Sequence, residues 1–232
     1  MLINPHCRFL KKSLLAILIS SSLFCDSIVF FTPPKDWECV KSKNLPEAIE
    51  IGFLKKGPLS FRPSLNLAKE KVSVSLKEYL SSVRKLHEKE LKVQWCDLGD
   101  FFCRAGKGRL AEIRSSSSGG ELRMLQAIFL SDGWAYILTG AAKKEDFPLE
   151  RGILLNALRS LSVVPDLFTA IPEEKRRTSL KEQYDSLNLN LDDEEKDLRW
   201  KNLAQTLSDY EDLGTYWLFL ALKEGRERIY GN

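Results

Sequence analysis

The sequence predicts an α+β protein: an α-β-α sandwich with a mainly antiparallel sheet, followed by a helical C-terminal extension. Three observations predict this class. Strand-like segments follow one another between residues 92 and 141, through connectors rich in Gly, Ser and Asp. Strands joined so closely pair antiparallel. Helical patterns lie before and after this run, and from residue 166 onward the chain is charged and helical in character.

The clearest helix of the first half spans residues 75–91. Leu76, Leu80 and Val83 recur in it at helical spacing, with Lys and Glu between them. Ser75 and Glu78 have the spacing of a capping box, which marks a helix start. Before this helix, residues 48–54 alternate imperfectly and favour a strand, and prolines keep residues 61–67 extended.

Five strand-like segments follow the helix, and a second helix over residues 147–161 closes the unit. The strands span residues 92–96, 101–104, 110–114, 122–130 and 134–141. A turn is predicted at residues 97–100, so Cys96 and Cys103 could face each other across a hairpin and form a disulfide. Free cysteines that pack as small apolar side chains are the alternative.

The tail is predicted to hold a charged helical stretch over residues 173–188 and then a longer helix. Four acids, Asp192 to Glu195, complement the dipole of that helix at its start. An apolar stripe with three–four spacing follows. Its candidate partner-binding residues are Trp200, Leu203, Leu207, Tyr210 and Trp217. The apolar run at residues 216–222 fits either a buried helix or a docking helix.

The first 27 residues have the pattern of an export signal. Arg8, Lys11 and Lys12 precede a short apolar stretch over residues 13–24, too short to span a bilayer. Cys25 stands where a lipoprotein signal places its lipidated cysteine, but bulky Phe24 departs from that pattern. Lipidation of Cys25, ordinary cleavage nearby and retention as an anchor remain open; lipidation and retention would attach the N-terminus to a membrane.

The charge pattern argues against nucleic acid as a partner. The net charge of +3 comes entirely from the signal, so the chain from Cys25 onward sums to zero, whereas phosphate binding needs clustered surplus Lys and Arg. The residues from Asp166 to the end include 15 acids and 10 bases, a net of −5, so residues 25–165 carry +5. Opposite charge favours docking of the tail on the preceding domain.

The sequence offers little for catalysis or metal binding. Its histidines are His6, within the signal, and His87, on the first helix, so a histidine-rich metal site is excluded. Gly106 to Gly108 lacks the spacing of a phosphate-binding loop, and the four acids at 192–195 lack the alternation of a calcium loop. We expect no cofactor. Carboxylate pairs for glycoside hydrolysis are defined by their distance in space, which sequence separation does not give.

Several motifs together resemble the PsbP/DcrB-like superfamily, over roughly residues 31–165. They are Phe61 to Leu67 (Phe-x-Pro-x-Leu-Asn-Leu), the helix start at Ser75, Gln126, the hairpin Asp132 to Ala141, and the closing Leu158 to Leu161. The order of the motifs carries the resemblance, and Ser160-Leu161 lacks the family's usual aromatic. The resemblance implies an α-β-α sandwich in an extracytoplasmic protein that binds other proteins without an established catalytic centre.

These observations predict a signal over residues 1–27, a PsbP/DcrB-like domain over 28–165 and a helical extension over 166–232. The favoured hypothesis is an exported, membrane-associated, non-enzymatic binding or assembly module of the cell envelope, in the periplasm or facing it, with a protein partner. A hydrolase with an unrecognised carboxylate site and a component of an envelope secretion machine are the alternatives.

Overall fold

The computed structural model describes residues 27–40, 45–46, 48–58, 61–89, 93–117, 120–187 and 192–231. These residues form two compact units, one of residues 36–159 and one that combines residues 27–35 with residues 160–231. From the sequence, we expected residues 28–35 to belong with the sheet and the domain boundary to follow Pro165. In the structure, residues 27–35 belong with the C-terminal helices and the division follows Arg159. The predicted signal and Cys25 lie outside the described residues.

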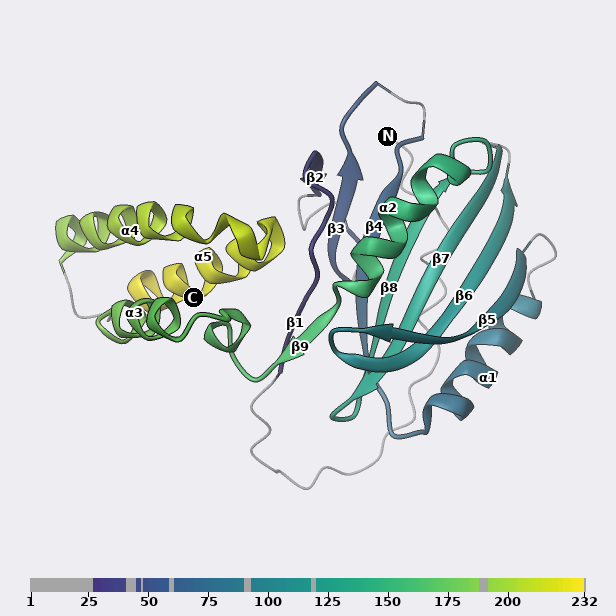
Figure 1. The fold of residues 1–232 in the computed structure, drawn as a ribbon, viewed down its shortest axis with the longest axis horizontal. Helices are drawn as coiled ribbons and strands as arrows, with labels where there is room; N and C mark the ends of the chain where they lie inside the picture. Colours follow the sequence, from purple (N-terminus) through teal and green to yellow (C-terminus); the bar gives the residue numbers. More distant parts are fainter. Residues whose placement is uncertain are drawn as a thin grey trace. The chain divides into compact units, whose positions relative to one another are not determined.

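The first unit is built on a seven-stranded antiparallel sheet with the strand order β2-β3-β4-β8-β7-β6-β5 (Figure 1). The strands are β2 (Trp37–Cys39), β3 (Ile49–Lys55), β4 (Ser64–Lys71), β5 (Val93–Cys103), β6 (Gly106–Ser117), β7 (Gly120–Ser131) and β8 (Trp134–Lys143). Every described neighbouring pair is antiparallel. This sheet confirms the predicted α+β class.

Two helices, α1 (Leu76–Glu88) and α2 (Phe147–Arg159), pack on opposite faces of the sheet. Ile137 of β8 belongs to a buried cluster with Tyr79 of α1. Gly140 faces α2, because a Cβ added there would lie 2.7 Å from Leu154 Cδ2. Successive strand residues point to alternate faces, so positions 137 and 140 face opposite sides. The first unit is therefore the predicted α-β-α sandwich.

Two sequence motifs of this unit have clear structural roles. The capping box forms as predicted: Ser75 Oγ accepts from the Glu78 N–H, and the Ser75 N–H donates to Glu78 Oε2 at 2.9 Å. Gln126 donates from Nε2 to Thr139 Oγ1 at 3.2 Å, across the β7–β8 pair. Both motifs therefore hold secondary structure in place.

The second unit joins a two-stranded antiparallel sheet to helices. Its elements are β1 (Ile28–Phe30), β9 (Ser162–Val164), the 3-10 helix η3 (Phe168–Ala170), α3 (Glu174–Asp185), α4 (Asp193–Leu207), the 3-10 helix η4 (Ser208–Leu213) and α5 (Thr215–Tyr230) (Figure 1). A Cβ on Gly225 of α5 would lie 2.3 Å from Leu203 Cδ2 of α4, so these two helices pack closely.

The long tail helix predicted from the stripe is instead two helices. The chain leaves α4 through η4 and begins α5 after Gly214, whose φ of 90° lies in the region that favours glycine. The stripe continues across the break because both helices face the same interior. Within the described residues, no helix has the length and hydropathy needed to cross a bilayer.

Candidate functional site

The candidate site lies on the β5–β6 hairpin, where a β-bulge interrupts β5. Asp97 pairs with Ala111 and Asp100 with Arg109, and the register shifts between Asp97 and Gly99. Ala111 and Arg109 are two positions apart on β6, so they share a face. The residues opposite them share that face as well. The bulge therefore brings two carboxylates onto one side, which regular alternation would separate.

Glycine makes this bulge possible. Gly99 has a φ of 100°, a conformation that other residues rarely adopt. Its N–H donates to Asp97 Oδ1 at 2.9 Å, so the carboxylate also stabilises the bulge backbone. The same residues, Asp97 to Asp100, were predicted to form a turn between two strands. In the structure β5 runs through them, and the hairpin turns at Arg104 and Ala105.

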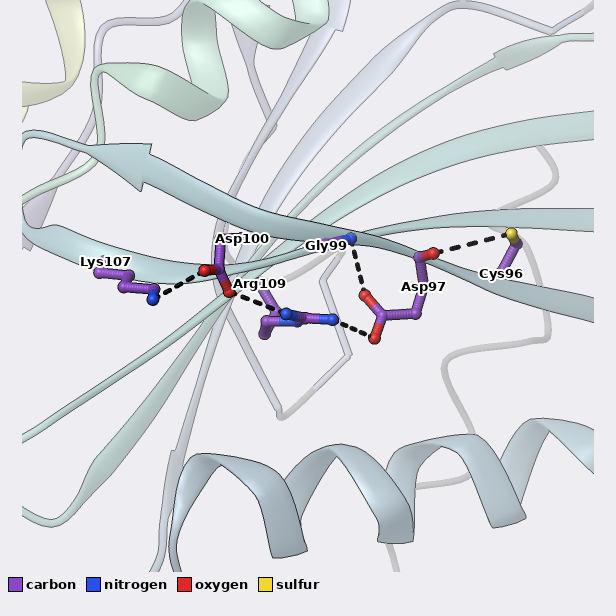
Figure 2. Close-up of polar contacts among 6 residues, drawn as sticks. All are labelled: Cys96, Asp97, Gly99, Asp100, Lys107 and Arg109. Atoms are coloured by element: carbon purple, nitrogen blue, oxygen red, sulfur yellow. Dashed lines mark hydrogen bonds and ion pairs between the residues drawn. The ribbon is translucent and has the colours of Figure 1, made fainter.

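Four charged side chains form one ion-pair network at the bulge, and we call them the bulge cluster (Figure 2). Arg109 binds Asp97 through Nη2 and Asp100 through Nη1, the latter at 2.8 Å. Lys107 Nζ lies 2.7 Å from Asp100 Oδ2. Two acids and two bases cancel in charge, and each carboxylate helps to fix the guanidinium plane in one orientation.

The network lowers the pKa of both of its aspartates and so favours their ionised forms. Burial would raise the pKa of Asp97, but hydrogen bonds from Arg109 and from the Gly99 N–H outweigh it and the pKa is lowered. Hydrogen bonds from Lys107 and Arg109 lower the pKa of Asp100. Groups held ionised make poor general acids at neutral pH, so this chemistry suits recognition better than proton transfer.

Exposed apolar side chains lie beside the cluster. Phe102 is 67% exposed and pairs with Lys107 on the cluster's face of the hairpin, and Leu98 in the bulge is 42% exposed. We call these two residues and the bulge cluster together the bulge surface. Aromatic anchors bordered by charged groups are typical of protein interfaces.

A second ion-pair group lies on the other face of the sheet. Glu112 accepts from Arg114 Nε at 2.9 Å and from Arg123 Nη2 at 2.7 Å, and its side chain is 10% exposed. Burial would raise the Glu112 pKa, but these hydrogen bonds lower it. Arg123 also lies over the Phe147 ring. Both guanidiniums are engaged with Glu112, which points to a structural role.

Cys96 and Cys103, which the sequence left open as a disulfide or as free thiols, form no disulfide in the structure. Both thiols are free, and both residues lie on β5 instead of on two strands of a hairpin. At a rise of about 3.3 Å per residue their Cα atoms are roughly 20 Å apart, beyond the ~7 Å limit for a disulfide. The alternative of small apolar cysteines fits little better, because Cys96 is exposed and Cys103 is half-buried.

The predicted partner-binding stripe of the tail lies largely inside the second unit. Leu203, Leu207, Tyr210 and Trp217 are buried, and Trp200 is half-buried. Trp217 donates from Nε1 to the Leu167 carbonyl at 3.0 Å and stacks on Tyr210 with ring centroids 5.9 Å apart. In this structure these residues form the core of the helical unit and offer little surface to a partner.

Sequence reasoning missed the bulge surface, although part of its signal was present. Asp-x-Gly-Asp occurs at turns and at bulges alike, so the motif alone could not show that one strand continues through it. On β6, Gly108 separates Lys107 from Arg109, so the two basic side chains share one face. They lie on the side of the hairpin that carries the acids of β5. No group of three or more His, Cys, Asp or Glu residues able to hold a metal occurs among the described residues.

No protein-family model matches the chain, and no curated protein matches it significantly. Similar solved structures include LpqN of Mycobacterium tuberculosis, which is involved in cell envelope biogenesis. LpqN has 13% sequence identity and a TM-score of 0.48, and the match covers 60% of this chain and 85% of LpqN. CyanoP of Synechocystis has 11% identity and a TM-score of 0.41, covering 63% of this chain and 98% of its own. PA94 of Pseudomonas aeruginosa, a protein of unknown function, has 14% identity and a TM-score of 0.39, and the match covers 58% of this chain and 81% of PA94.

CyanoP is a PsbP protein, from the superfamily that the sequence resembles. All three likenesses fall below 25% identity and below a TM-score of 0.5. They therefore carry no argument about what this chain binds.

Proposed function

We propose that the protein is an exported, non-enzymatic module of the cell envelope that binds another protein through the bulge surface. The exposure of Phe102 is the observation that carries this proposal. Burying a phenylalanine side chain contributes about 1.5–3 kcal/mol, and 67% of Phe102 remains exposed on β5. A partner that covers Phe102 would gain much of that free energy.

The charges around Phe102 suit a specific contact. Arg109 is fixed by two carboxylates before any partner arrives, so binding costs little side-chain entropy there. Lys107 is 59% exposed and Asp100 is 44% exposed, and both border Phe102. The fitting partner is a protein surface with an apolar recess for Phe102 and a carboxylate within reach of Lys107.

Export is the second part of the proposal and rests on the sequence. A basic start followed by a short apolar stretch over residues 13–24 is the pattern of a secretory signal. The envelope location follows from that signal. The hydrolase alternative is less favoured, because every described carboxyl group with a shifted pKa is shifted downward, whereas a catalytic acid needs the opposite.

The test compares matched surface substitutions. Phe102→Ser removes the apolar anchor, and Leu149→Ser removes an 82% exposed leucine from α2 of the same unit. Tagged full-length chains are expressed in the native host, and the proteins that co-purify from envelope fractions are quantified by mass spectrometry. We expect Phe102→Ser to lose a partner that Leu149→Ser retains. Equal recovery of every protein with both variants would contradict the proposal.

A further inference from the structure

The first described residues of the chain are integral to the C-terminal unit. β1 pairs antiparallel with β9, through Ile28 with Val164, Val29 with Val163 and Phe30 with Ser162 (Figure 1). Val29 is 8% exposed and Phe30 is 5% exposed. A strand of three residues is too short to be stable alone, so side-chain contacts must hold it in place.

Phe31 supplies one of those contacts. Its side chain is fully buried, and its ring meets Tyr216 of α5 edge-to-face with centroids 5.4 Å apart. Tyr216 is itself 4% exposed. Loss of the Phe31 ring would therefore uncover the first turn of α5, directly beside Trp217 at the centre of the helical unit.

Thr32 fixes the end of the segment. Its N–H donates to Ser160 Oγ at 2.8 Å, although the two residues are 128 positions apart. Its methyl group lies 3.3 Å from where a Cβ on Gly214 would stand. Since Gly214 is the N-cap of α5, the segment contacts this helix at its start and β9 along its length.

We infer that residues 28–32 are a closing strap of the helical unit: α5 reaches its full stability only when this segment is seated on β9 and Tyr216. This inference is independent of the proposed partner binding. Residues 36–159 form the other unit. The helical unit can therefore be completed only after residues 27–35 and the residues that follow position 159 have both been synthesised. Because the predicted export signal directly precedes the strap, a membrane tether there would be attached to the helical unit.

Hydrogen exchange measured by mass spectrometry on the full-length chain tests the strap, since it resolves each helix. Phe31→Ala removes the buried ring, and Phe219→Ala is the matched control, because Phe219 lies on α5 but is 48% exposed. Ser160→Ala, which removes the acceptor for the Thr32 N–H, is a milder second variant. Peptides from β7 and β8 report on the other unit.

We expect Phe31→Ala to speed exchange in α5 by about tenfold or more, with β7 and β8 unchanged. Ser160→Ala should speed hydrogen exchange in α5 by a smaller factor, and Phe219→Ala should leave the exchange rate of α5 unchanged. Unchanged α5 protection in Phe31→Ala would overturn the inference. So would an equal loss of protection in β8, because the segment would then stabilise the whole chain instead of the helical unit.

Discussion

Asp97 and Asp100 lie on the same face of β5 although three positions separate them, and both bind Arg109. The bulge at Gly99 produces this arrangement, and the exposed Phe102 follows on the same face. The proposed interaction surface therefore depends on one backbone irregularity.

Gly99→Val should destabilise the first unit, because valine at a φ of 100° is strained by about 1–3 kcal/mol. The strain should be relieved by loss of the bulge, which would separate Asp97 from Asp100. Urea unfolding measures the free energy of unfolding. Gly152→Ala is the control: a Cβ on this helical glycine meets nothing within 4 Å, so stability should be unchanged or rise by about 0.5–1 kcal/mol. A fully stable Gly99→Val protein would show that the bulge does not require glycine.

The bulge cluster should stabilise the fold above the ordinary pKa of aspartate and lose that effect in acid. The pKa values of Asp97 and Asp100 are lowered in the folded chain. A lowered pKa means that the folded state favours the ionised form, so the contribution fades as the pH falls from about 5 toward 2. Arg109→Gln should flatten this pH dependence, as measured by thermal unfolding across that range. Arg151→Gln, on the exposed side of α2, should leave the dependence of the melting temperature on pH as in wild type. The same pH dependence in wild type, Arg109→Gln and Arg151→Gln would contradict a stabilising role of the bulge cluster.

The centre of the sheet should not tolerate truncation. Tyr136 is fully buried on one face of β8, and Ile137 is 9% exposed on the other, within the cluster around Tyr79. Replacing either with alanine should cost about 2–5 kcal/mol in the free energy of unfolding. Leu149→Ala, at an 82% exposed position, should have little effect. Melting temperatures near wild type for both core variants would mean that β8 is not central.

The crossing of α4 and α5 should depend on Gly225. An added Cβ would lie 2.3 Å from Leu203 Cδ2, so Gly225→Ala overpacks the helical unit by about 1–3 kcal/mol. Leu203→Ala removes the clashing group, and the double variant should be more stable than the sum of the single changes predicts. Strict additivity in this double-mutant cycle would contradict a direct contact.

The mature chain should begin between residues 23 and 28. The apolar stretch ends at Phe24, and strand β1 begins at Ile28, so later cleavage would remove part of β1. N-terminal sequencing of the protein from its native host measures this, and Cys25→Ser should release the protein from membranes if Cys25 is lipidated. An intact Met1 on soluble cytoplasmic protein would exclude export.

Local patterns predicted local structure well. The capping box at Ser75 and the strand over residues 134–141 each depend on neighbouring residues, and both formed as predicted. The bulge was missed because Asp97 to Asp100 contains the residues that also favour turns. The last part of the tail was predicted as one long helix, where the structure has α4 and α5, because the apolar stripe keeps its spacing across Gly214.

The pairing of strands that lie far apart in the chain left no such pattern in the sequence. β1 is three residues long and pairs with β9 more than a hundred positions away, so neither segment indicates the other. The sequence therefore assigned residues 28–35 to the sheet domain. The stripe from Trp200 to Trp217 was correctly predicted to be apolar, but periodicity cannot tell a buried core from a partner-binding face.

The most direct test of the proposed function is site-specific photo-crosslinking at the bulge surface. A photoreactive phenylalanine analogue replaces Phe102 in the full-length chain in its native host, and the same analogue at position 149 of α2 serves as the control. We expect a discrete crosslinked product from position 102 that Arg109→Gln weakens and that position 149 does not give. The same products from both positions, or none from position 102 while other sites crosslink, would contradict it.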